Sequence, residues 1–550
     1  MSAAVLALFL VCGVIAVLWE ARQADLQRRR AEQRVGQLVE LANRTLFDVH
    51  GAIERLPGAA EARRKIVATT LEYLDQLARE TGDDDRVQLA LASAYARLAE
   101  VRGNPNVPSL GEWTGALATY QKAARILDAL LAREPRHPVY LLRRAQVSVG
   151  LTTSLIMFEK RKQAQPEVAR GIRSAEAFLA IQPGNLEGRK LEAKLQRDRL
   201  TLLLEQDPAA AEKDALRLLP KYTSLASQYP NDPEAITEWA GAQIILGAAA
   251  SLQNRRTESL AYFHQAAQRL ETANRLHPHD VVIQKDLLRT YSRIAANLDA
   301  SHASPEELQQ YTRKEERMAA SLRAADPSDF MVRFDVAQAY YSLGSMTVPL
   351  AQVPESLRML GEAQKIIELM IADSPTVLRL KVGLIVIYST QGEQLERLHR
   401  YREALRAYRA LLDVAGSVAA AGPGTYADNE LAVGAAEACK LLAILGERRE
   451  SLAFAAKAAA AGGRIQQKWP GSVAQLLKRV GDAMVTLARK PRPAAHRAAD
   501  LEAARNYYSQ AQKIWASLPE DKRKNYQTEI TETSAARAAC QRELTQALVR

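Results

Sequence analysis

The chain has 550 residues, with 74 Lys or Arg and 63 Asp or Glu, so its formal net charge is +11. Hydrophobic residues make up 47% and charged residues 25%, which indicates a folded rather than a disordered chain, and the length exceeds one compact core. Only 6% of the residues are aromatic, and the arginines are interleaved with glutamates. The positive charge therefore indicates a solvated helical surface rather than a nucleic-acid interface.

The chain opens with an uninterrupted apolar run over residues 3–19, AAVLALFLVCGVIAVLW. As a helix this run would span about 25 Å, close to the thickness of a bilayer core, with Trp19 at the interface. A cleaved signal peptide is the alternative. However, no Lys or Arg precedes the run, and Leu18-Trp19-Glu20 is a poor cleavage sequence. We predict a transmembrane anchor over residues 1–21.

Basic residues follow the anchor directly, at Arg22, Arg28, Arg29, Arg30 and Arg34. Applied to this flank alone, the positive-inside rule predicts that the remaining chain is cytoplasmic. The rule compares both flanks, so basic residues upstream of Met1 would reverse the prediction.

Residues 22–87 are predicted as a juxtamembrane helical segment. One apolar face runs along its first part, through Leu38, Leu41, Ala42, Thr45, Leu46, Val49 and Ile53. This face could serve as a stalk or as the seam of a homodimer. It could equally cover the open end of the first structural repeat, because a helical solenoid needs a terminal cap.

The same region carries a set of short motifs: Leu41-Ala42-Asn43, Phe47 to His50, Leu56-Pro57-Gly58, Ala62-Arg63, Leu71 to Asp75 and Gly103-Asn104-Pro105. It resembles the segment that follows the transmembrane helix in certain bacterial receptor-like serine/threonine protein kinases. The resemblance covers about residues 1–135 and implies an extracytoplasmic repeat domain. No Gly-rich phosphate loop, His-Arg-Asp or Asp-Phe-Gly occurs in this sequence, so the resemblance carries no kinase activity over.

Beyond residue 88, a proline recurs at intervals of 47 to 49 residues, at Pro135, Pro183, Pro230, Pro278, Pro327, Pro375, Pro423, Pro470 and Pro519. Proline lacks a backbone donor and disfavours helix in the residue before it, so each one predicts the end of a helix. The residues between the prolines are mainly helix formers. The period therefore predicts about nine stacked helical pairs over residues 88–519.

Seven units also carry a small residue nineteen positions before their proline, at Ala116, Ala164, Ala211, Ser259, Ser356, Ala404 and Ser451, and the units that end at Pro327 and Pro519 are shifted by one and by about four residues. A larger apolar residue often follows four positions later, as at Tyr120, Val168, Phe263, Leu360 and Tyr408. We expect the small residue to let paired helices approach and the large one to fill the next gap. This order resembles a lengthened tetratricopeptide repeat, which implies an all-α solenoid with a concave groove for a protein or peptide. Residues 520–550 are predicted as a C-terminal capping helix.

Motifs for chemistry are absent from the sequence. The eight histidines form no His-Glu-x-x-His, and Cys12, Cys439 and Cys540 have no zinc or disulfide spacing. No Gly-x-Ser-x-Gly occurs. Trp113 and the stretch 102–112 form either a ligand loop or a passive connection. We predict no catalytic, cofactor or metal residues, and the ligand-binding residues stay unassigned.

The sequence thus predicts a membrane-anchored, non-catalytic protein–protein interaction or sensing scaffold. Residues 3–19 would hold it in the membrane as a single-pass protein, with the repeats outside the cytoplasm. Its partner would be a protein or peptide, and neither a cofactor nor a nucleic acid is expected. The alternative is the sensor half of a serine/threonine protein kinase whose catalytic domain is missing from this chain or separately encoded.

Overall fold

The structure is a computed structural model. It describes residues 60–80, 84–103, 112–301, 304–325, 329–421, 426–491 and 493–549, with a few single positions besides. The predicted anchor, apart from Trp19 and Glu20, lies outside these residues, as do Cys12 and the apolar face from Leu38 to Ile53. Within the described ranges, one helix is long and apolar enough to cross a membrane, Pro233–Leu252, and 78% of its apolar window is buried in the fold.

The described part of the chain contains helices and no strands, and it divides into two compact units. Unit 1 runs to Asn297 and includes Leu322–Val332, and unit 2 comprises Leu298–Ser321 and Arg333–Arg550. The predicted all-α solenoid of helical pairs is confirmed for these residues.

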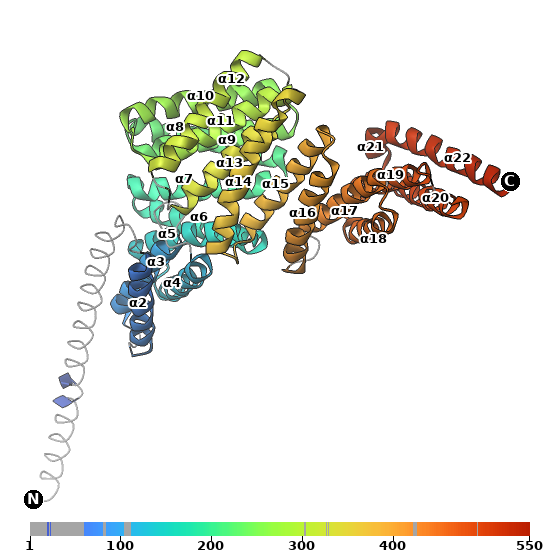
Figure 1. Cartoon of the computed structure of the whole chain (residues 1–550). Helices are drawn as coiled ribbons and strands as arrows, with labels where there is room; N and C mark the ends of the chain where they lie inside the picture. The colour runs from blue at the N-terminus through green and yellow to red at the C-terminus, as the bar shows by residue number, and fades with distance from the viewer. Residues whose placement is uncertain are drawn as a thin grey trace, which may run out of the picture. The chain divides into compact units, whose positions relative to one another are not determined.

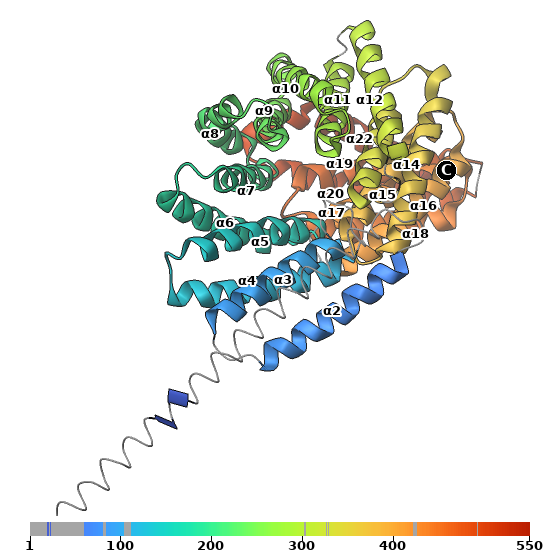
Figure 2. The same ribbon diagram turned by 90° about the vertical axis from the view of Figure 1, so that its left-hand side faces the viewer.

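Unit 1 stacks its helices in chain order (Figure 2). They are α2 (Ala60–Glu80), α3 (Asp85–Gly103), α4 (Trp113–Arg133), α5 (Pro138–Met157), α6 (Arg161–Ile181), α7 (Leu186–Leu204), α8 (Pro208–Gln228), α9 (Pro233–Leu252), α10 (Arg256–Leu276) and most of α11 (Val281–Ser301). Pairs form between α3 and α4, α5 and α6, α7 and α8, and α9 and α10. The first helices α3, α5, α7 and α9 also pack on one another in succession, so they form the inner layer.

Unit 2 repeats this arrangement (Figure 1). Its helices are most of α12 (Pro305–Ala325) and α13 (Phe330–Ser345), then η1 (Leu350–Gln352), α14 (Val353–Asp373), α15 (Leu378–Arg397), α16 (Tyr401–Ala421), α17 (Tyr426–Leu445), α18 (Arg448–Ile465), α19 (Pro470–Ala488), α20 (Ala494–Ala516), α21 (Glu520–Arg523), η2 (Lys524–Tyr526) and α22 (Gln527–Val549). Pairs form between α15 and α16, α17 and α18, and α19 and α20. The last helix, α22, packs against α20 and α19, where the sequence predicts a cap.

The periodic prolines act through the residue before them. Seven helices, α4, α6, α8, α10, α12, α14 and α16, end two residues ahead of their proline. Five of the pre-proline residues share one backbone conformation, with φ from −127° to −141° and ψ from 66° to 80°, namely Glu134, Gln182, Tyr229, His277 and Ser374. This is the non-helical conformation that a following proline favours. Pro470 departs from the prediction: α18 has already ended at Ile465, and Pro470 is the first residue of α19.

The small residues of the repeat lie where paired helices meet, and all seven are buried. The three serines among them also donate a hydrogen bond across the pair, each to the carbonyl twelve positions earlier. Ser259 bonds Gly247 at 2.7 Å, Ser451 bonds Cys439 at 2.9 Å, and Ser356 bonds Gly344. The predicted close approach is confirmed.

In three pairs the larger residue four positions later packs against a glycine on the first helix. A Cβ built on Gly247 would lie 2.6 Å from the ring of Phe263, and one on Gly392 would lie 2.6 Å from that of Tyr408. Leu360 has the same relation to Gly344, at 2.7 Å. The large side chain fills the space that the glycine leaves, as predicted.

A second kind of contact joins a first helix to the helix before it at three places. A first-helix tyrosine donates its hydroxyl to an acidic residue twenty positions earlier: Tyr95 to Asp75 at 2.7 Å, Tyr291 to Glu271 at 2.9 Å, and Tyr388 to Glu368 at 2.9 Å. Because Asp75 lies on α2, this helix occupies the position of the second helix of a preceding pair.

Candidate binding groove

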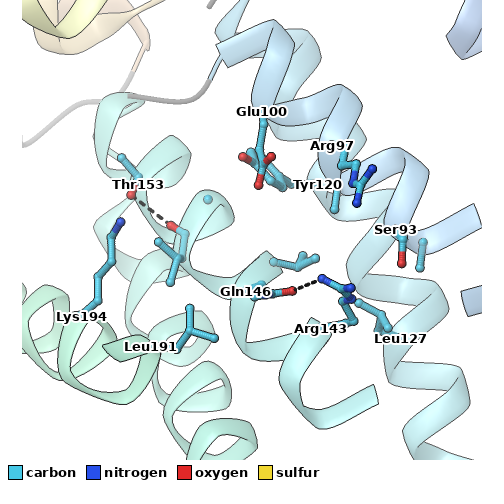
Figure 3. Close-up of a pocket in the computed structure, with 15 residues that line it drawn as sticks. Ser93, Arg97, Glu100, Tyr120, Leu127, Arg143, Gln146, Thr153, Leu191 and Lys194 are labelled. Carbon is cyan, nitrogen blue, oxygen red and sulfur yellow. Dashed lines mark hydrogen bonds between the residues drawn. The ribbon is translucent and has the colours of Figure 1, made fainter. Parts of the chain in front are cut away.

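A pocket of about 280 Å³ opens on the inner layer of unit 1, between α3, α4, α5 and α7 (Figure 3). Tyr120 reaches it from α4, and the ring passes between α3 and α5 because Gly150 has no side chain. A Cβ at Gly150 would lie 2.2 Å from the Tyr120 ring. The glycine therefore shapes the apolar base of this pocket.

Four charged side chains surround the pocket: Arg97 and Glu100 from α3, Arg143 from α5 and Lys194 from α7 (Figure 3). The Arg143 guanidinium donates to Gln146 Oε1 at 2.9 Å. In the described part of the chain, neither Arg143 nor Lys194 has a carboxylate within ion-pair distance. Within these residues, two cations of this pocket thus make no ion pair.

Glu100 is the one carboxylate among these groups. Burial raises its pKa, and the three cations Arg97, Arg143 and Lys194 act in the opposite direction. With three positive groups and one carboxylate, the pocket favours an anionic ligand.

The inner layer continues past the pocket onto α9. Arg197 lies three residues after Lys194, on the same face of α7. Its side chain crosses Gly241 of α9, where an added Cβ would lie 2.5 Å from the arginine Cδ. Its Nη2 is 3.4 Å from Oε1 of the buried Glu238. We call the pocket together with Arg197 the groove of unit 1.

The first helices of unit 2 carry a cluster of carboxylates, in contrast to the cations around the pocket of unit 1. Carboxylates gather on α15 and α17, at Glu393, Glu396, Glu430 and Glu437. Burial and its acidic neighbours raise the pKa of Glu393. Lys440 pairs with Glu396 at 2.7 Å, and Arg479 pairs with Glu437 at 2.5 Å. These ion pairs account for part of the cluster without a ligand.

The residues weighed for chemistry do not come together. Cys439 and Cys540 are buried free thiols, and burial raises the pKa of Cys439 to about 11, which makes it a poor nucleophile. No group of three or more His, Cys, Asp or Glu residues within the described ranges is placed to hold a metal ion. His277 Nε2 lies 3.1 Å from the Asn231 carbonyl, in a turn between pairs.

Trp113 turns out to be a core residue. It is 1% exposed, and its ring centroid lies 4.8 Å from that of Phe330. The stretch 104–111 before it lies outside the described residues. Trp113 itself therefore offers no surface to a ligand, which favours the passive interpretation of this position.

The described helices form a solenoid of helical pairs with a charged pocket on the inner layer of unit 1. No protein-family model matches the chain, and no curated protein matches it. Among solved structures, the chain is similar to the human IFIT1 dimer with PPP-AAAA, at 14% identity over 85% of this chain and 93% of that chain, with a TM-score of 0.36. It is also similar to the S. pombe nuclear import adaptor Nro1, at 14% identity over 64% of this chain and 99% of that one, with a TM-score of 0.29. These similarities concern the helical fold alone.

Proposed function

We propose that the protein is a non-catalytic binding scaffold whose groove in unit 1 takes an extended protein segment carrying an acidic side chain. The observation that carries this proposal is the pair Arg143 and Lys194, which face one pocket with no carboxylate partner in the described part of the chain. A ligand carboxylate would accept charge-assisted hydrogen bonds from them. A volume of about 280 Å³ suits a side chain better than a whole metabolite.

The charge pattern favours a peptide over a nucleic acid. Glu100 and Glu238 lie on the same inner face as the cations. They would repel a continuous row of phosphates, whereas a peptide can place one carboxylate on the cations and keep neutral groups elsewhere.

We further propose that residues 3–19 anchor the scaffold in a membrane, with the repeats outside the cytoplasm. The support is the apolar run and the resemblance of residues 35–105 to kinase juxtamembrane segments. The same resemblance supports a role as the sensor half of a serine/threonine kinase. Protease added to intact spheroplasts should digest the repeats. Protection until lysis would contradict the orientation, and an in-frame kinase domain upstream of Met1 would favour the sensor role.

The groove is tested by fluorescence anisotropy with labelled peptides that carry Glu or, as an isosteric control, Gln. We expect the Glu peptide to bind at least tenfold more tightly, and Arg143→Glu or Lys194→Glu to remove this preference. The matched control is Arg173→Glu, which makes the same charge change at an exposed position on α6. Equal binding of the two peptides, or equal losses in the control, would contradict the proposal. Tighter binding of a ribo-oligonucleotide would also contradict it.

A further inference from the structure

Arg197 is held in the groove with its hydrogen-bonding capacity unused. The glycine at position 241 lets the guanidinium lie across α9, because a methyl group there would approach Nη1 to 3.0 Å. The side chain stays 23% exposed. Within the described ranges its guanidinium makes no hydrogen bond, although arginine has five N–H donors. A ligand in the groove can therefore reach these donors.

Glu238 lies beneath this guanidinium. The residue is 4% exposed, and its Oε2 has no hydrogen-bond partner among the described residues. The closest cation is Arg197, whose Nη2 is 3.4 Å from Oε1, too long for a strong charge-assisted hydrogen bond. Glu238 is thus a buried carboxylate with one incomplete partner.

The groups around Glu238 come from three neighbouring helices. From α7, Arg197 and Lys194 lower its pKa and Asp198 raises it, and Asp286 of α11 also raises it. Burial is the largest influence, and the resulting pKa is about 7. Tyr222 of α8 faces the same region, but its hydroxyl donates to the Ala193 carbonyl at 3.0 Å and its raised pKa keeps it neutral. Glu238 therefore changes charge near neutrality, and burial also raises the pKa of its neighbour Asp198.

We infer that Arg197 is a second anion-binding residue of the groove and that Glu238 competes with the ligand for it. The inference rests on the proposed function and specifies how that groove is regulated. When Glu238 is ionised, it neutralises Arg197 from below and repels an incoming carboxylate. When Glu238 is protonated, Arg197 can pair with a second acidic side chain of the segment beside Lys194. Affinity for an acidic segment therefore rises as the pH falls through 7.

The experiment compares dissociation constants at pH 6, 7 and 8 for a peptide that carries two Glu residues, one for the pocket and one for Arg197. The wild-type chain should bind several-fold more tightly at pH 6 than at pH 8. Glu238→Gln, which is nearly isosteric, should bind at every pH about as tightly as the wild type does at pH 6. Arg197→Gln should bind weakly with little pH dependence, and thermal unfolding of each variant checks that it is folded.

An unchanged pH dependence in Glu238→Gln would overturn the inference, as would equal wild-type affinity at pH 6 and pH 8. Either result leaves the proposed function standing, because the peptide still binds. Absence of binding at every pH would instead refute the proposed function and, with it, the competition. Gly241→Ala is a further check, since displacing Arg197 should weaken binding most at pH 6.

Discussion

Two neighbouring arginines on α5 show how finely the role of a side chain depends on helix rotation. Arg143 faces the groove, whereas Arg144 is fully buried between α4 and α6. Arg144 Nε lies 2.6 Å from Asp128, and its Nη1 lies 2.7 Å from Glu167. Successive residues of a helix are about 100° apart, so adjacent positions meet different surroundings. Nothing in the dipeptide Arg-Arg distinguishes the two roles.

We expect Arg144→Met to lower the free energy of unfolding by about 3–5 kcal/mol, because it removes the closest counter-charge of the buried Glu167 and leaves it only Arg170, at 3.6 Å. Arg143→Met is the matched control and should change stability by less than about 1 kcal/mol. Urea unfolding followed by circular dichroism measures both. Similar losses in the two variants would show that the Arg144 network does not stabilise the fold.

The ionisation of Glu238 should make the stability of the chain depend on pH. Its pKa is raised from 4.5 to about 7 in the folded chain, so the neutral form is the one that the fold favours. This contribution to stability is complete below about pH 4.5 and disappears as the pH rises through 7. Glu238→Gln should therefore reduce the fall in unfolding free energy between pH 5 and pH 8, by about 1–3 kcal/mol. The difference between the two pH profiles is the measurement, and parallel profiles would contradict the prediction.

At the scale of the helix, some glycines lie against a side chain of a neighbouring helix and others face open space. On α15, Gly392 lies under the Tyr408 ring, whereas no atom lies within 4 Å of a Cβ built on Gly383. We expect Gly392→Ala to destabilise the chain by about 1–3 kcal/mol through overpacking. Gly383→Ala should stabilise it by about 0.5–1 kcal/mol, as in an open helix interior. Thermal melts of the two variants should shift in opposite directions, and shifts of the same sign would refute the packing role of Gly392.

Four of the turns inside the pairs contain a residue in the left-handed backbone conformation. It is Glu159, Asn254, His399 or Gly446, with φ between 55° and 85°. Only glycine and asparagine are typical at such a position. His399→Gly should therefore raise stability by about 0.5–1 kcal/mol, whereas Gly446→Ala should lower it by a similar amount. Urea midpoints test the pair, and a destabilised His399→Gly would show that the contact of His399 with Tyr401 matters more.

Across the whole molecule, the fold was more predictable than the groove. Each proline affects the backbone of the residue before it, so the helix ends could be predicted from the sequence. The small and large residues make contact within one helical pair, so their packing could be predicted as well. Pro470 is the exception, because a proline can open a helix as well as follow one.

The groove residues depend on the stacking of successive pairs. Arg97, Arg143 and Lys194 share one pocket only because α3, α5 and α7 pack side by side. Their spacings of 46 and 51 residues do not follow the 47- to 49-residue period of the prolines. Periodicity therefore could not select them from the other arginines and lysines, and their shared position appears only in three dimensions.

The central claim is that an acidic segment binds on the inner layer of unit 1. Photo-crosslinking with a Glu peptide that carries a benzophenone group, followed by peptide mass spectrometry, tests it most directly. The account predicts crosslinks to α3, α5 and α7, near Ser93, Gln146 and Leu191, and their loss in Lys194→Glu. Crosslinks concentrated on the outer helices, for example around the exposed Leu216 of α8, would contradict it.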